Sequence, residues 1–168
     1  MGTESRVGPA LTEGLVAGLI GYVAVVLTVA AIDLLQGFGL VHTPREIGMA
    51  LFFGGSGAPA PSDAMAPVLA WNGVHLVASL LAGLLGALMV LGAERFLGFW
   101  WAGLMVLVTV GVYALIGLGG FGVQVAGVLD WTTALLGTAA WLASMTAYFA
   151  WAHRRLRGQL EMEMGSDG

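Results

Sequence analysis

Three polar residues inside apolar stretches of the chain could do chemistry: Asp33, Asn72 and His75. Polar and ionisable side chains within membrane-spanning helices are costly and usually have a partner or a function. Asn72 and His75 lie one turn apart on the same face of a predicted helix. Asp33 lies at a similar depth near the end of the preceding helix, so a hydrogen bond between a ring nitrogen of His75 and the Asp33 carboxylate is geometrically possible. These residues form a candidate intramembrane polar site that could relay protons.

The same residues also have structural interpretations. His75 could make a single interhelical hydrogen bond to a backbone carbonyl or a hydroxyl and only hold helices together. Asp33 and Glu13 lie near helix ends, where charged side chains commonly extend to the membrane interface. Trp71, one turn from His75, could mark an interface or stack on the imidazole ring. Structural and functional interpretations both stay open at the level of the sequence.

Histidine spacing argues against a haem. Two histidines on predicted crossings, His75 and His153, lie about 12 Å and about 35 Å from the outer helix ends, so one iron could not reach both. A site with nitrogen and oxygen ligands on the outer side is an alternative, formed by His75 with His42, Asp33 and Glu46. His42 and Glu46 have simpler explanations as loop and cap residues. We therefore expect no catalytic residue, no cofactor and no bound metal.

The composition of the chain is typical of an integral membrane protein. Its 168 residues are 58 % hydrophobic and only 10 % charged, with a mean hydropathy of +0.90, whereas charged residues make up about 25 % of ordinary soluble domains. The six basic residues are all Arg and are outnumbered by ten acidic residues, so no surface for nucleic acid is expected. The absence of Cys excludes disulfides, thiolate metal sites and Cys nucleophiles. The whole chain, 1–168, is expected to form one membrane domain.

Four apolar segments predict an all-α bundle of four transmembrane helices at 11–37, 67–92, 99–118 and 130–153. The second segment has no formally charged residue and would extend about 39 Å as a helix, which exceeds the thickness of a bilayer core. The first segment is longer than the apolar region of a signal peptide, so we expect it to be retained. The GLGGFG sequence at 117–122 lacks the βαβ setting of a nucleotide-binding loop and is better explained as a flexible helix end.

A short helix is predicted between the first two crossings. Thr43, Pro44 and Glu46 match the N-cap, N1 and N3 positions of a capping box, and Gly54 would end the helix. After its charged start this helix, 44–54, is apolar enough to lie on the outer membrane interface or to fold back over the bundle.

Small or hydroxyl-bearing residues recur at three- and four-residue steps on one face of three predicted crossings. Such faces let helix backbones approach closely. On the second crossing, Val77, Leu81 and Leu88 form an opposing aliphatic stripe that suits lipid. The expected helix-packing residues are Gly14, Gly18, Gly21, Ser79, Gly86, Gly137 and Ser144.

Arginine placement predicts the orientation. With four crossings, every Arg except Arg45 falls on one side, which the positive-inside rule makes cytoplasmic. Both termini are then cytoplasmic, with a cytoplasmic tail at 154–168 that is acidic after Gly158, and the short helix at 44–54 lies outside. The Ala, Gly and Leu content, with Arg and no Lys, indicates a bacterial gene, so the expected location is the bacterial cytoplasmic membrane.

These patterns predict a class of protein more clearly than a function. Small-residue faces without a reaction motif favour a non-catalytic accessory or structural subunit of a larger membrane complex, such as a respiratory one. Its partners would be the lipid bilayer and other membrane subunits or further copies of itself. The alternative is a small homo-oligomeric transporter or channel with Asp33 and His75 near the pathway. A membrane enzyme with a metal centre is a third possibility.

Overall fold

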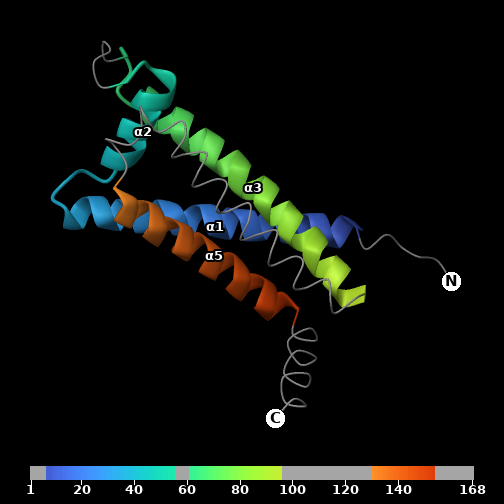
Figure 1. Ribbon diagram of the computed structural model, residues 1–168. Helices are drawn as coiled ribbons and strands as arrows, with labels where there is room; N and C mark the ends of the chain where they lie inside the picture. The colour runs from blue at the N-terminus through green and yellow to red at the C-terminus, as the bar shows by residue number, and fades with distance from the viewer. Residues whose placement is uncertain (1–6, 56–60, 96–129, 154–168) are drawn as a thin grey trace.

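The computed structural model describes residues 7–55, 61–95 and 130–153, and within these ranges it contains four helices and no strand (Figure 1). The all-helical prediction is confirmed for these residues. The predicted third crossing at 99–118, the GLGGFG sequence at 117–122 and the predicted tail at 154–168 lie outside them. The helices are α1 (Val7–Leu35), α2 (His42–Phe52), α3 (Ala66–Arg95) and α5 (Trp131–Ala152).

Helix α1 is the centre of the arrangement, because α3 and α5 both pack extensively against it and have few contacts with each other. Both helices run antiparallel to α1. On α3, Leu84 lies beside Gly14 and Leu80 beside Gly18, near the start of α1. The start of α5 approaches the second half of α1, while its end reaches Glu13. The ribbon in Figure 1 shows α3 and α5 both inclined to α1.

Helix α2 begins one residue before Thr43, at His42, with Val41 in the N-cap position and no side-chain cap hydrogen bond. The prediction that Thr43 caps this helix is therefore wrong. The physical reason is that Thr43 is already bonded to the end of α1, as described below. Gly54 and Gly55 follow the helix with φ values of +83° and +84°. Glycine adopts this left-handed conformation without steric cost, so the two glycines end α2 as Gly54 was predicted to do.

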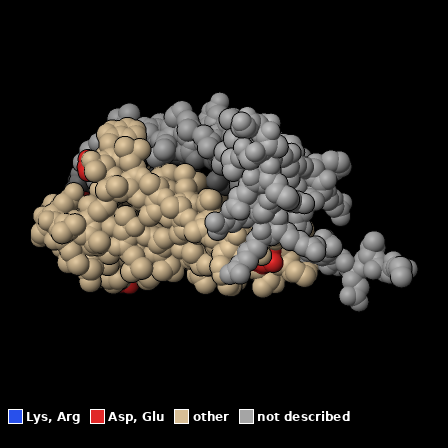
Figure 2. Space-filling model, turned by 90° about the horizontal axis from the view of Figure 1, so that it is seen from below, with Lys and Arg blue, Asp and Glu red and all other residues tan. Residues whose placement is uncertain are grey.

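Two helical segments, Gly8–Leu35 and Ala66–Gly92, are long and apolar enough to cross a membrane. With 28 and 27 residues, they would extend about 40 Å each. Only 17 % and 28 % of their most apolar windows are buried inside the molecule. The core helix of a soluble protein would be mostly buried, so these helices present apolar surface outward. In the view of Figure 2, uncharged residues dominate the described surface.

The buried core lies where all three long helices meet, near the start of α1. It contains Ala17, Ala87, Val90, Met145 and Phe149, with Trp141 and Tyr148 partly buried against it. The ring of Phe149 on α5 reaches the backbone of Gly86 on α3. This core fixes the positions of the helices on which the polar site is built.

Candidate functional site

His75 lies on α3 between two aromatic rings. The ring of Trp71, one turn earlier on the same helix, is stacked on the imidazole with a centroid distance of 5.8 Å and an interplanar angle of 27°. The ring of Tyr22, from α1, lies 5.9 Å from the imidazole at 41°. The alternative that Trp71 stacks on His75 is confirmed. The imidazole is therefore held by α1 and α3 together.

Asn72 joins the same group of residues through Tyr22. The Tyr22 hydroxyl donates a hydrogen bond to Asn72 Oδ1 at 3.1 Å, and Asn72 Nδ2 donates to the carbonyl of Val68 at 2.8 Å. Because Tyr22 contacts both Asn72 and the ring of His75, it links the two polar residues of α3 across the helix interface. We call Tyr22, Trp71, Asn72 and His75 the His75 cluster.

One ring nitrogen of His75 has no partner. Nε2 is buried, and no hydrogen-bond partner lies within reach of it among the described residues. The same holds for Nε1 of Trp141 on α5. A buried polar atom without a partner costs about 1–3 kcal/mol, so native proteins rarely leave one unsatisfied without a reason. The His75 cluster therefore has unused hydrogen-bonding capacity at its centre.

Asp33 is fully buried, but its carboxylate is bonded elsewhere. Oδ2 accepts a hydrogen bond from the backbone N–H of Thr43 at 2.9 Å, and Oδ1 accepts one from the Thr43 hydroxyl. The structure records no bond between Asp33 and His75. Of the three residues of the candidate polar site, the structure thus joins Asn72 and His75 and places Asp33 at the junction of α1 and α2.

Tyr22 is the member of the His75 cluster that the sequence reasoning missed. A signal was present, since Tyr22 follows Gly14 and Gly18 at the same four-residue spacing. That spacing places the three residues on one helix face. Gly14 and Gly18 lie against α3, so a phenol four residues further on reaches the same helix.

Six of the seven predicted helix-packing residues lie at helix interfaces. A Cβ added at Gly18 would come within 2.5 Å of the Ser79 carbonyl oxygen and 2.7 Å of Leu80 Cα. Ser79 is itself buried. At Gly14 the nearest atom would be Leu84 Cα at 2.7 Å. The backbones of α1 and α3 are therefore too close for side chains at these positions.

The remaining packing residues involve α5. A Cβ at Gly21 would meet the Trp141 ring at 2.7 Å, and one at Gly86 would meet Phe149 at 2.9 Å. Gly137 faces α1 at ordinary van der Waals distances, and the Ser144 hydroxyl donates to a backbone carbonyl of its own helix at 3.0 Å.

Two further close glycine contacts were not predicted. A Cβ at Gly83 would overlap the carbonyl oxygen of Gly14 and come within 2.5 Å of Gly18 N. A Cβ at Gly48, on α2, would overlap the backbone of the fully buried Pro67. Gly83 therefore belongs to the α1–α3 contact, and Gly48 lets α2 rest on the start of α3.

Other ionisable residues of the described ranges do not converge on a site. No group of three or more His, Cys, Asp or Glu side chains within 7–55, 61–95 and 130–153 could hold a metal ion. His42 instead stacks on Phe38 with ring centroids 4.1 Å apart. His153 Nε2 lies 3.0 Å from Glu13 Oε2, which connects the end of α5 to the start of α1. The chemistry available in the His75 cluster is hydrogen bonding and proton exchange at one imidazole.

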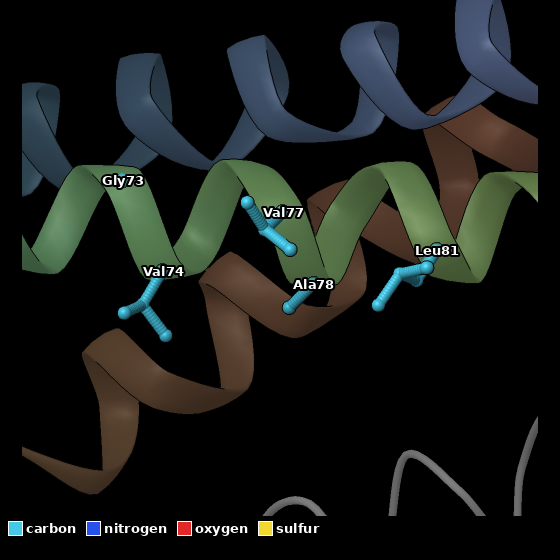
Figure 3. Close-up of a pocket in the computed structure, with 5 residues that line it drawn as sticks. All are labelled: Gly73, Val74, Val77, Ala78 and Leu81. Carbon is cyan, nitrogen blue, oxygen red and sulfur yellow. The ribbon is translucent and has the colours of Figure 1, made fainter.

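An open apolar groove of about 350 Å³ lies on the outward face of α3. Gly73, Val74, Val77, Ala78 and Leu81 line it, and Figure 3 shows Val74, Ala78 and Leu81 extending away from α1. Val77 and Leu81 are 57 % and 61 % exposed. This is the stripe that the sequence predicts to suit lipid, and no ionisable side chain lines it.

Comparison of the chain with protein-family models, with curated proteins and with solved structures found no match.

Proposed function

We propose that this protein is a multi-pass integral membrane protein and that it acts as a non-catalytic structural or accessory subunit of a larger membrane complex. The observation that carries the membrane part is the surface of α1 and α3. Both helices are long enough to span a bilayer, and large apolar side chains are exposed along them. Leu27 is 65 % exposed on α1 and Leu69 is 63 % exposed on α3. Burying such surface in lipid is favourable, whereas exposing it to water is not.

Helix directions support the proposal of four crossings. Helices α3 and α5 both run antiparallel to α1, so α3 ends beside the start of α1 while α5 begins beside its second half. If α1, α3 and α5 each cross the membrane, the chain has to cross it once more within the 34 residues from 96 to 129. We propose that the predicted transmembrane helix at 99–118 makes this crossing. Both termini would then be cytoplasmic, in the membrane of a bacterial cell, with α2 on the outer side.

A structural role is supported by how the polar side chains are used. Asp33 joins α1 to α2, the hydroxyl of Tyr22 bonds to α3, and Glu13 contacts α5. Each of these contacts holds helices together. Small-residue contacts bring the same helices into close approach. The outward face of α3 is left for lipid or for a helix of a neighbouring subunit.

Native mass measurement after gentle detergent extraction tests the subunit proposal. The expected result is a reproducible complex in which this chain is bound to another membrane protein at fixed stoichiometry. A variant with Leu81→Asn on the outward face of α3 should lower the yield of the complex while the isolated chain keeps its helical content. A lone monomer with no stoichiometric partner under several mild detergents would contradict the proposal.

The unpartnered Nε2 of His75 supports a second candidate, a small homo-oligomeric transporter or channel with His75 and Asp33 near its pathway. Proton or ion flux through the native chain in liposomes should then exceed that through His75→Ala. Background flux in both would eliminate this candidate.

A further inference from the structure

The buried Nε2 of His75 requires a hydrogen-bond partner. Its immediate neighbours on two sides are the rings of Tyr22 and Trp71, whose faces offer no conventional hydrogen bond. Leaving the nitrogen unsatisfied inside an apolar helix interface is unfavourable, and ordered water is the usual solution when protein groups cannot supply the bond.

The residues around His75 have the capacity to hold such a molecule. The Tyr22 oxygen donates its proton to Asn72, which leaves its lone pairs available as acceptors. Asn72 uses one Nδ2 proton for the carbonyl of Val68, and its second proton has no recorded partner. Together with His75 Nε2, these groups supply three hydrogen-bonding sites from two helices. A buried water typically makes about three hydrogen bonds.

We propose that Tyr22, Asn72 and His75 bind one ordered water molecule at the interface of α1 and α3. The water completes the hydrogen bonding of the imidazole and links it to the Tyr22–Asn72 pair. This site is independent of whether the protein is a subunit or a transporter, because it follows from the contacts within the chain.

Trp141 provides a matched control. Its Nε1 is also buried and unpartnered, but the ring packs against Gly21, and the nearest other side chain at that contact is the apolar Met145. At that contact no second polar side chain is among the nearest atoms, so a water there would lack the partners that it needs. The proposal therefore predicts a hydrated nitrogen at His75 and a dry nitrogen at Trp141.

The test is water-edited ¹⁵N solid-state NMR of the native chain in vesicles of phosphatidylcholine and phosphatidylglycerol. The His75 Nε signal, assigned by its loss in His75→Gln, should gain magnetisation from water at least about twice as fast as the Trp141 Nε1 signal. In Tyr22→Phe and in Asn72→Leu, transfer to His75 should fall while the backbone spectrum stays close to that of the native chain. Three results would overturn the proposal: no magnetisation transfer from water to the His75 signal, equal transfer to the His75 and Trp141 signals, or transfer to His75 that is unchanged in both variants.

Discussion

The carboxylate of Asp33 accepts hydrogen bonds from both the backbone N–H and the hydroxyl of Thr43. Asp33 belongs to the last turns of α1, and Thr43 belongs to the first turn of α2. Because the first N–H groups of a helix have no partner within it, a carboxylate placed there acts as a cap from a neighbouring helix. The end of α1 therefore determines where α2 starts.

Replacing Asp33 should release α2. Asp33→Leu removes the acceptor for Thr43 and leaves its N–H unsatisfied, at an expected cost of about 1–3 kcal/mol. Arg45 is the only Arg or Lys between Val7 and Arg95, so trypsin cleavage after Arg45 reports the opening of α2. Cleavage should become faster in Asp33→Leu. Asp130→Asn is the control, because Asp130 is exposed and makes no side-chain cap bond; equal cleavage rates in the two variants would contradict the role of Asp33.

Adding one methyl group at Gly83 should weaken the packing of α1 against α3. Gly83→Ala places a Cβ against the backbone of Gly14 and Gly18, where no flexible side chain can move away. We expect a loss of about 1–3 kcal/mol in the free energy of unfolding, measured by circular dichroism in detergent. Gly73→Ala is the matched control on the same helix, since nothing lies within 4 Å of its Cβ position. A similar thermal midpoint in both variants would show that the backbones are not in close contact.

A smaller side chain on α5 should offset the destabilising effect of a larger side chain on α3. Gly86→Ala places a Cβ 2.9 Å from the Phe149 ring, and Phe149→Leu alone leaves a cavity. We expect each single variant to be destabilised by about 1 kcal/mol. The double variant should lose less than the sum of the two, because the smaller side chain makes room for the methyl group. Strict additivity in thermal unfolding would argue against this contact.

The Glu13–His153 pair should contribute little to stability. The side chains are 35 % and 14 % exposed respectively, and partly exposed ion pairs are typically worth less than about 1 kcal/mol. A double-mutant cycle with Glu13→Gln and His153→Gln should give a coupling free energy in that range. A coupling of several kcal/mol would mean that this pair, rather than glycine packing, holds α5 against α1.

Helix packing was easier to predict from the sequence than the polar contacts. The spacing of Gly14 and Gly18 identifies a face because helical periodicity is local. The same is true of the stripe containing Val77 and Leu81, which the structure exposes.

Contacts across helices depend on tertiary arrangement instead. Asp33 lies ten residues before Thr43, and only the turn through Gly37, with φ of +82°, brings them together. From the sequence alone, Thr43 is predicted to cap its own helix and Asp33 to bond to His75. The bond from Tyr22 to Asn72 spans 50 residues, which no local pattern encodes.

The central proposal is that the chain crosses the membrane several times, with α5 as a span beside the two candidate spans in α1 and α3. The chain has no Cys, so single substitutions at the exposed positions Gly8, Asp63, Asp130 and Ala152 can be labelled without background. The measurement is reaction with a membrane-impermeant maleimide in sealed right-side-out vesicles. Asp63→Cys and Asp130→Cys should react, whereas Gly8→Cys and Ala152→Cys should react only after the vesicles are opened. Reaction of all four variants in sealed vesicles, or of Asp63→Cys and Ala152→Cys from the same side, would contradict the account.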